Sequence, residues 1–543
     1  MFVLAALAVL IGCSSTNKAA PPPTGGFSNT NLSGTYVFST AGEDSNLAQP
    51  EFLVMVGSFT ACGCAAGTIS GGVVDMNDPD TLIFTAGPVK QLAITGGSYS
   101  VGVDGRGKAS LSAATPFGSS IELDFVLSSS QGGLVTEFDA NGSGSGTLDL
   151  QSSPAQTAGT YVFNLAGIAG VSATSGAGIP LATVGSVTLD ASGNATGVQD
   201  FNNDGASSSS TSPLTISSSS PVLIGTSPAT TTLVSGAGTF NFDVYAISPT
   251  HLKLIETDVE PILVGDVFQQ TSASFPSGEL VFTMAGADLA GPGPLVVGGM
   301  MSSNGSSTLS NGVEDYNDLG LSNVVLGTST TPIPFSGGVS VSGTGRYLVT
   351  FNSGFENGNA GNNTISYMFV AYPSTGGTQL LEIDNVPGGI TGGVAYPQNS
   401  TSFASGQGYG LNLTGSNPSS EEDDIAEFTN NNNALTGLID VNDEGDFNPP
   451  QNFGANYTPD TTNLGRGVIL STTSATPNLV SYTVDSTNSI FIEIDPNQVA
   501  VGSIGQQASE SQGAIATRMA VLRPRALARG AWKKRPAADS QGR

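Results

Sequence analysis

Hydrophobic and polar residues alternate along most of this 543-residue chain, with a period of two residues rather than the 3.6 of a helix. In the segment Gly-Thr-Tyr-Val-Phe, Tyr36 and Phe38 fall on one face, and related segments begin at Gly159, Gly278 and Gly408. A period of two is that of a β-strand with one buried face. Gly, Ser, Asn and Asp interrupt the alternation about every ten residues, as turns between strands do. The pattern therefore predicts an all-β protein.

A second pattern indicates four tandem copies of one unit. The segment Gly-x-x-Asp-x-Asn occurs four times, and its aspartates are Asp75, Asp200, Asp315 and Asp440. Successive aspartates are 125, 115 and 125 residues apart. A solenoid repeat has roughly 20 to 50 residues and a domain about 100 to 150, so we expect each copy to fold as its own module. The predicted modules span residues 31–152, 153–276, 277–402 and 403–508.

Within the first module the alternation predicts eight strands joined by short loops. They cover residues 33–40, 51–60, 66–76, 91–103, 106–113, 119–130, 133–139 and 145–151. Consecutive strands with short connections favour an antiparallel meander, and closure into an up-and-down barrel of the lipocalin or avidin kind removes exposed edges. The Gly-Thr-Tyr segment is similar to the Gly-x-Trp that begins such barrels. An immunoglobulin-like sandwich of two sheets is the alternative.

Two further motifs recur in the modules. An arginine preceded by glycine has the same place in three of them, as Arg106, Arg346 and Arg466. A Glu-x-Asp motif follows in all four, and its glutamates are Glu137, Glu256, Glu382 and Glu493. Together with Gly-Thr-Tyr-x-Phe and Asp-x-Asn-Asp, these motifs resemble uncharacterised repeat lipoproteins of bacteria over residues 31–508. The resemblance implies an exported protein and indicates no activity.

The first residues are typical of an export signal. Residues 1–10 are almost wholly apolar and lead into Leu-Ile-Gly-Cys-Ser, which resembles a bacterial lipoprotein signal whose lipobox cysteine, Cys13, is lipidated after cleavage. The alternative is a short buried apolar segment, because crossing a bilayer needs about 20 apolar residues. Residues 14–30 are polar and rich in Pro and Gly, which predicts a flexible stalk. We expect a lipid anchor to the outer membrane or cell surface, in the cell envelope.

Charge is distributed unevenly along the chain. Its 43 Asp and Glu outnumber 15 Lys and Arg, for a net charge of −28. Eight of the basic residues nevertheless lie in residues 515–543. An acidic body repels phosphate backbones, so we expect no nucleic-acid partner. Residues 509–543 lack a strand pattern and are predicted to be a basic disordered tail. The alternatives are contact with an anionic membrane or polymer and translation in a wrong reading frame.

The arginines are predicted to form ion pairs inside their own modules. A partly buried guanidinium needs a carboxylate partner, and the Glu-x-Asp acids are the candidates. The predicted pairs are Arg106 with Glu137, Arg346 with Glu382 and Arg466 with Glu493. The alternative is a solvated strand residue. The second module has no such arginine, and we expect Lys253 to serve Glu256.

One copy of the repeated acidic segment matches the start of a calcium loop. Asp200, Asn202 and Asp204 supply oxygens at alternate positions before Gly205, as calcium loops do. Thr211 stands where the bidentate glutamate of such a loop belongs. The alternative is that the Asp and Asn side chains cap the backbone of a turn. No cofactor other than calcium is expected.

Cys62 and Cys64 are predicted to lie in the loop between the second and third strands of the first module. In an exported protein such a pair forms a local or intermolecular disulfide, or stays as two free thiols. Two thiolates are too few ligands for a zinc site.

Conventional catalytic groups are scarce. His251 is the only histidine, so a Ser-His or Cys-His nucleophile is restricted to the second module, and its position favours a turn residue. Acids that recur in all four modules are typical of a framework. We therefore expect a non-enzymatic envelope lipoprotein with a structural, adhesive or binding role toward an extracellular protein or glycan. The alternative is a secreted polysaccharide hydrolase that uses the carboxylates of one diverged module.

Overall fold

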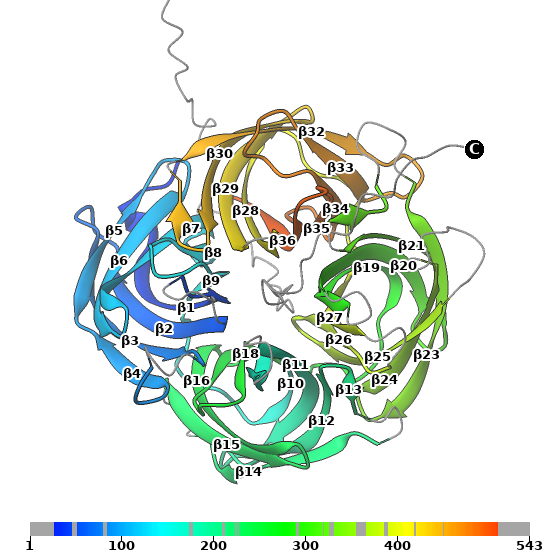
Figure 1. Ribbon diagram of the computed structural model, residues 1–543, viewed down its shortest axis with the longest axis horizontal. Helices are drawn as coiled ribbons and strands as arrows, with labels where there is room; N and C mark the ends of the chain where they lie inside the picture. Colours follow the sequence, from blue (N-terminus) through cyan, green and yellow to red (C-terminus); the bar gives the residue numbers. More distant parts are fainter. Residues whose placement is uncertain are drawn as a thin grey trace, which may run out of the picture.

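The four modules are closed β-barrels. The computed structural model describes residues 26–45, 52–79, 84–172, 178–208, 212–222, 225, 227–288, 293–318, 320–324, 331–354, 365–384, 389–417, 420–448 and 450–508. Within these ranges the one helical segment is a single 3-10 turn, η1 (Asn29–Asn31), and nothing helical is long and apolar enough to cross a membrane. The strands form four antiparallel barrels in tandem (Figure 1). The predicted barrels are confirmed, and the sandwich alternative is wrong.

Barrel 1 shows the topology. Its strands are β1 (Ser33–Glu43), β2 (Phe52–Cys62), β3 (Thr68–Asn77), β4 (Val89–Ile94), β5 (Gly96–Val101), β6 (Arg106–Thr115), β7 (Gly118–Ser129), β8 (Gly132–Glu137) and β9 (Ser145–Leu150). They are ordered β2-β1-β9-β8-β7-β6-β5-β3, and β3 pairs with β2 to close the circuit of eight. This is the up-and-down meander, because, with β4 left aside, each strand pairs with its neighbour in sequence and β9 returns to β1.

The same circuit recurs three times. Barrel 2 consists of β10 (Gly159–Val171), β11 (Gly178–Leu189), β12 (Ala195–Asn203), β13 (Ala206–Ser207), β14 (Leu214–Ser220), β15 (Ala229–Ser235), β16 (Gly238–Ser248), β17 (His251–Glu256) and β18 (Ile262–Gln269). Barrel 3 consists of β19 (Ser277–Asp288), β20 (Gly293–Asn304), β21 (Thr308–Asp318), β22 (Leu321–Ser322), β23 (Ile333–Gly343), β24 (Arg346–Ser353), β25 (Ile365–Ser374), β26 (Gly377–Glu382) and β27 (Gly389–Pro397). Barrel 4 consists of β28 (Gln407–Ser416), β29 (Glu421–Asn431), β30 (Ala434–Asp443), β31 (Asp446–Phe447), β32 (Gln451–Pro459), β33 (Arg466–Ser471), β34 (Leu479–Thr483), β35 (Asn488–Glu493) and β36 (Val499–Gln506).

One strand of each barrel lies outside the circuit of eight. It is β4 in barrel 1 and the two-residue strands β13, β22 and β31 in the others, and each pairs with the third strand of its barrel. In barrel 1 the predicted strand 91–103 is therefore two strands, β4 and β5. The break coincides with Gly96 and Gly97, whose φ values of 155° and 156° are rarely adopted by other residues.

Each barrel is filled by inward-facing side chains of its own strands. In barrel 1 the predicted face of Tyr36 and Phe38 is buried, and the Tyr36 ring stacks on Phe59 with centroids 6.2 Å apart. The Tyr36 hydroxyl donates to the carbonyl oxygen of Ser130 at 2.7 Å, so its polar end is satisfied. The barrel interior is thus a packed core.

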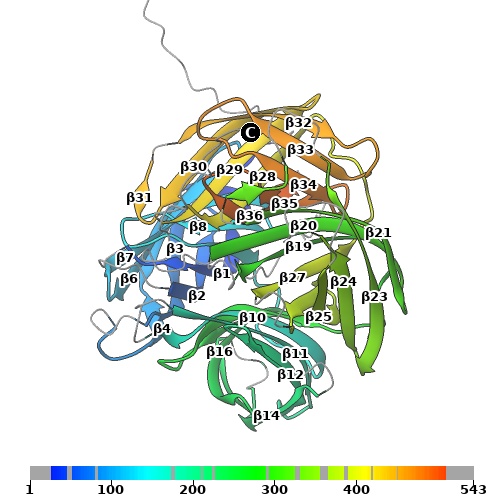
Figure 2. The same cartoon turned by 45° about the vertical axis from the view of Figure 1, so that its right-hand side comes forward.

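The barrels lie side by side in a ring, with barrel 4 next to barrel 1 (Figure 1, Figure 2). Apolar residues on the outward faces of the strands are buried between neighbours. These clusters include Val54, Ile255 and Ile262 between barrels 1 and 2, Val184, Val370 and Ile390 between barrels 2 and 3, and Val296, Val480 and Ile492 between barrels 3 and 4. Between barrels 4 and 1 the described cluster is smaller, with Val126, Leu134 and Ile425. Each module is a barrel of its own and also part of one assembly.

Candidate functional site: the joints between barrels

The repeated Asp-x-Asn segment lies on the third strand of each barrel, at its contact with the next barrel. Alternation along a strand directs the Asp and the Asn outward and the residue between them inward. Met76, for example, belongs to the core of barrel 1. We call the contact between neighbouring barrels a joint. Each joint combines an Asp and an Asn of one barrel with a side chain and the backbone carbonyl of a glutamate of the next. These are Asp75 and Asn77 with Tyr245 and Glu256 in joint 1–2, Asp200 and Asn202 with Arg346 and Glu382 in joint 2–3, Asp315 and Asn317 with Arg466 and Glu493 in joint 3–4, and Asp440 and Asn442 with Arg106 and Glu137 in joint 4–1.

The asparagine makes the same contact in all four joints. Its Nδ2 donates to backbone carbonyl oxygens in and after the Glu-x-Asp motif of the next barrel. The distances are 2.9 and 2.8 Å from Asn77 to Glu256 and Asp258, 3.0 and 3.2 Å from Asn202 to Glu382 and Gly389, 3.0 and 2.7 Å from Asn317 to Glu493 and Gln498, and 2.8 and 2.9 Å from Asn442 to Glu137 and Gly142. The last of these contacts joins the fourth module to the first, so the ring is closed by hydrogen bonds.

The aspartate pairs with an arginine and a tyrosine in joints 2–3 and 3–4. Asp200 accepts from Nε and Nη2 of Arg346 at 2.8 and 2.7 Å, and from the Tyr372 hydroxyl at 2.5 Å. Joint 3–4 repeats this geometry. There Asp315 accepts from Arg466 at 2.6 and 2.9 Å and from the Tyr482 hydroxyl at 2.5 Å. Both arginine side chains are 1% exposed and both aspartates 0%, so these are buried bidentate pairs.

The predicted pairing of these arginines with Glu382, Glu493 and Glu137 is wrong. Each arginine is on the outward face of its barrel, since Arg466 lies opposite Tyr482 and Arg106 opposite Val126, both of them joint residues. The glutamates are on the inward face. Their neighbours on the adjacent strand belong to barrel cores: Phe369 lies opposite Glu382, Leu479 opposite Glu493 and Leu123 opposite Glu137. Side chains on opposite faces of one sheet cannot meet, and the arginines bind the aspartates of the preceding barrel.

Lys253 does not form the predicted ion pair with Glu256 either. It donates to Asp266 at 2.9 Å, and His251 Nε2 lies 2.6 Å from the same carboxylate. The His251 ring stacks on Phe268 with centroids 4.4 Å apart. Glu256 instead accepts from the backbone N–H of Asn241 at 3.0 Å. His251 is thus the first residue of β17 rather than a turn residue, and it contacts the buried pair of Lys253 and Asp266.

Among the described residues joint 1–2 has no arginine, because Thr239 follows Gly238 where the other modules have it. Asp75 accepts from the Tyr245 hydroxyl and, at 2.6 Å, from the backbone N–H of Gln91. The Gln91 side chain donates to Asp243 at 3.1 Å, which places a second acid at this joint. Burial, together with the charge of Asp243, raises the pKa of Asp75 to about 7.

Joint 4–1 has the arginine but not the tyrosine. Arg106 donates to Asp440 at 3.1 Å and to Asp104 at 3.3 Å, and its side chain is 20% exposed. Val126 stands where the other barrels have Tyr245, Tyr372 and Tyr482. Close by, Lys108 pairs with Asp124 at 2.7 Å, and burial raises the pKa of Asp124 to about 6.

Two of the three residues proposed as calcium ligands, Asp200 and Asn202, have protein donors to their side-chain oxygens. Asp200 is bound by Arg346 and Tyr372 as described above, and Asn202 Oδ1 accepts from the backbone N–H of Gly205 at 2.9 Å. Asp204 occupies the turn that follows, with a φ of 50°. Asn202 therefore caps the turn, as in the alternative interpretation. In the described ranges, no group of three or more His, Cys, Asp or Glu is arranged to hold a metal ion.

Cys62 and Cys64 form a disulfide in the hairpin between β2 and β3, with an S–S distance of 2.10 Å. This is the local disulfide, one of the alternatives that the sequence leaves open. Cys13, the signal, residues 14–25 of the stalk and the basic tail 509–543 lie outside the described residues.

The joint tyrosines were missed in the sequence. Aligning the modules would have found them, because Tyr245, Tyr372 and Tyr482 occupy one position in the strand that pairs with the arginine strand.

The acids of β29 were also missed. Tyr36 pairs with Phe59 in barrel 1, and Tyr409 pairs with Phe428 in the same way in barrel 4. With these pairs superimposed, residues 421–424, Glu-Glu-Asp-Asp, align with residues 52–55, Phe-Leu-Val-Met. Barrel 4 thus carries four acids where barrel 1 is apolar.

Comparison with known proteins adds little. No family model and no curated protein matches the chain. Two solved structures show a distant likeness: the translocation pore of the P pilus usher PapC, with 7% identity over 87% of this chain and 99% of that chain at a TM-score of 0.13, and the alcaligin outer membrane receptor FauA from Bordetella pertussis, with 9% identity over 88% and 76% at a TM-score of 0.10. TM-scores this low support no conclusion about fold or function.

Proposed function

We propose that the protein is a non-enzymatic scaffold of the cell envelope, a closed ring of four β-barrels that presents a binding or adhesive surface to an extracellular protein or glycan. One observation carries this proposal. The acids and amides that recur in every module are used to join each barrel to the next, including the fourth to the first. A rigid display scaffold requires such contacts, because they fix the position of each barrel relative to its neighbours.

The positions of the acids weigh against the hydrolase alternative. A glycosidase needs two carboxyl groups that flank a sugar in an open site. The four glutamates of the Glu-x-Asp motifs, Glu137, Glu256, Glu382 and Glu493, are at most 3% exposed and face barrel interiors. Three of the four unmatched acids of β29 are also buried, with Asp423 at 0% and Asp424 at 2%, while Glu422 is partly exposed. Burial of most of these acids supports the non-enzymatic proposal over the hydrolase.

Attachment to the membrane is the second part of the proposal. We propose that Cys13 carries the lipid and that the following stalk separates the ring from the membrane. Acyl chains stabilise membrane attachment by about 0.8 kcal/mol for each buried methylene group, so several chains hold the protein firmly. Labelled palmitate should be incorporated into the wild-type chain, and Cys13→Ala should release the protein from membranes. Unchanged membrane association of Cys13→Ala would contradict the lipoprotein assignment.

The binding role is tested with the mature chain on a glycan array and in pull-downs from an envelope fraction. A matched variant, Asn442→Ala, removes the amide that links barrel 4 to barrel 1 and leaves all four barrel interiors unchanged. We expect a ligand that contacts several barrels to bind the variant more weakly than the wild type. Release of reducing sugar ends from a polysaccharide by the wild-type chain would overturn the non-enzymatic assignment.

A further inference from the structure

The disulfide between Cys62 and Cys64 is not required by the fold. The equivalent hairpins of the other barrels contain no cysteine, and Asp or Asn side chains satisfy their turns. In barrel 2, for instance, Asp190 accepts from the backbone N–H groups of Ser192 and Asn194 at 2.8 and 2.9 Å. A crosslink between residues two apart also restricts the unfolded chain little, because its stabilising effect grows with loop length. Stabilisation of the fold therefore does not explain why this disulfide is present.

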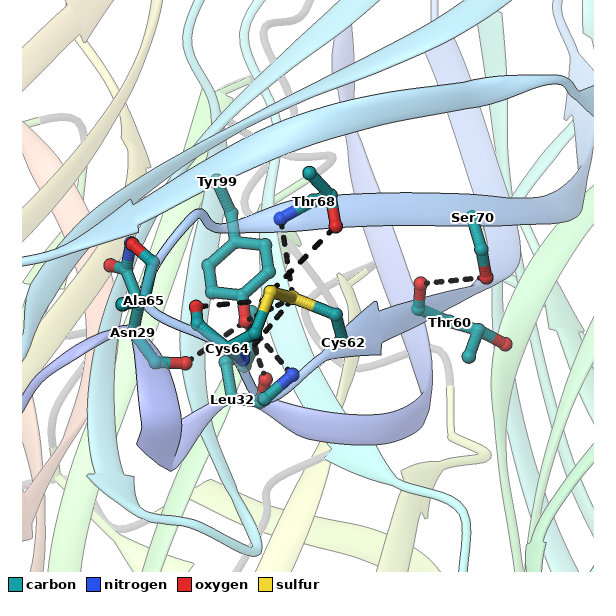
Figure 3. Close-up of a disulfide and its surroundings, with 10 residues drawn as sticks. Asn29, Leu32, Thr60, Cys62, Cys64, Ala65, Thr68, Ser70 and Tyr99 are labelled. Carbon is teal, nitrogen blue, oxygen red and sulfur yellow. Dashed lines mark hydrogen bonds between the residues drawn. A yellow bond between two sulfur atoms is a disulfide. The ribbon is translucent and has the colours of Figure 1, made fainter.

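Hydrogen-bond donors converge on one of the two sulfur atoms (Figure 3). Cys62 Sγ lies 3.1 Å from the backbone nitrogen of Cys64 and 3.4 Å from that of Thr68, and both N–H groups point to it. The hydroxyl oxygen of Tyr99 lies 3.5 Å from the same atom but adds no donor, because its hydrogen goes to a backbone carbonyl oxygen of Asn29 or Leu32. For Cys64 Sγ the described part of the chain provides one contact, which is longer, 3.8 Å to Thr68 Oγ1. Donors of this kind stabilise a thiolate over a thiol, so the site favours negative charge on Cys62.

The loop that holds the site is built for this geometry. Gly63 has a φ of 62°, and a Cβ there would approach Ser33 Oγ to 2.3 Å. Its backbone N–H donates to the Tyr99 hydroxyl at 3.1 Å, and that hydroxyl donates to the carbonyl oxygens of Asn29 or Leu32 at 2.9 and 3.0 Å. The residue Cys62 is exposed and Cys64 is partly exposed, so a partner can reach the pair.

We propose that Cys62 and Cys64 form a thiol–disulfide exchange site that oxidises a dithiol on a partner polypeptide. A partner thiolate attacks Cys64 Sγ, the bond between the two sulfurs breaks, and Cys62 leaves as the thiolate held by the N–H groups of Cys64 and Thr68. The second partner thiolate then attacks the mixed disulfide and releases Cys64. The partner loses two electrons and two protons and becomes a disulfide, while Cys62 and Cys64 become the dithiol. This activity is independent of the scaffold role.

The order of attack is tested with the full chain carrying Cys13→Ala, which leaves the pair as its only cysteines. Oxidised protein is mixed with glutathione as the probe, quenched in acid, and mapped by mass spectrometry. We expect glutathione on Cys64 and a free thiol on Cys62. Glutathione on Cys62, or a pair that glutathione reduces only after unfolding in urea, would overturn the proposal.

Two single-cysteine variants in the same background are matched controls for the environment of each sulfur. Cys64→Ala leaves Cys62 with both N–H donors, and Cys62→Ala leaves Cys64 without them. We expect thiolate absorbance at 240 nm to appear at lower pH for Cys62, and iodoacetamide to alkylate it about tenfold faster at pH 7. Equal titration of the two thiols would overturn the proposal. So would a fall of more than about 5 °C in melting temperature on reduction, which would assign the pair a structural role.

Discussion

Joint 2–3 and joint 1–2 have the same hydrogen-bond frame and different charges. In both, an asparagine amide donates to the next barrel's backbone and a buried aspartate accepts from a tyrosine hydroxyl. Arg346 neutralises Asp200 in joint 2–3. In joint 1–2 none of the described residues is an arginine, and Asp243 adds a second acid where barrel 3 has Val370. The amide contact therefore sets the geometry, and the charged partner decides how favourable burial of the acid is.

Joint 4–1 differs again. Its ion pair is partly exposed and its described apolar cluster is the smallest of the four. The acids of β29 lie close to it, and burial, with the charges of Asp139, Asp423 and Asp44, raises the pKa of Glu137 well above its usual range. Four joints of equal geometry are thus unequal in energy, and the joint that closes the ring is the least apolar.

Removal of the buried arginine should have the largest effect. Arg346→Ala leaves Asp200 at 0% exposure without its cation. Loss of one partner of a buried ion pair destabilises by about 3–5 kcal/mol. We expect a lower melting temperature in differential scanning calorimetry of the full chain, with the loss in the transition that involves barrels 2 and 3.

The matched control is Arg106→Ala in joint 4–1. The side chain of Arg106 is 20% exposed and that of Asp440 is 5% exposed, so water reaches Asp440 more easily than it reaches Asp200 once the guanidinium is gone. We expect a smaller loss than in joint 2–3, between the roughly 1 kcal/mol of an exposed ion pair and the loss for a fully buried one. Equal losses for the two variants would show that burial does not distinguish these joints.

The second prediction concerns pH. The pKa of Asp75 is about 7 in the folded protein and roughly 3.9 in an unfolded chain. Between these values the folded state binds more protons, so the contribution of joint 1–2 to stability falls as pH rises from about 4 to 7. Asp75→Asn should stabilise the protein at pH 8, on the order of 2 kcal/mol, and change little at pH 4. Calorimetric melting temperatures of wild type and variant at both pH values measure this difference.

Asp200→Asn is the contrasting variant. It leaves Arg346 without its carboxylate, so we expect destabilisation at pH 8 and at pH 5. If the two Asp→Asn variants changed stability equally at pH 8, the lack of an arginine at joint 1–2 would have no effect on stability.

The smallest expected effect is that of calcium. The carboxylate of Asp200 is bound to Arg346, and Asn202 donates to the next barrel and caps its own turn. Millimolar calcium should therefore give no saturable heat in isothermal titration and no shift in melting temperature. A saturable heat that Asp204→Ala abolishes would instead assign the ion to this turn.

Much of the barrel could be predicted from local pattern. The alternation at Tyr36 and Phe38 identifies the buried face of a strand, and the even spacing of Asp75 and its equivalents identifies the modules. Short connections leave few ways to pair eight strands, and closure of the sheet follows because it removes both edges. For Cys62 and Cys64 the sequence left a local disulfide, an intermolecular disulfide and free thiols open, and the structure has the local disulfide.

The joints could not be predicted, because a period of two shows which face a residue occupies but not what covers that face. Arg346 and Arg466 meet carboxylates 146 and 151 positions away, and Arg106 meets one 334 positions away. Outward acids would be solvated on an isolated barrel. Only the packing of four barrels in a ring buries them, and a buried acid must then find a donor across the joint. The sequence alone thus sufficed for the barrels, while their tertiary arrangement determined the partners of every joint aspartate.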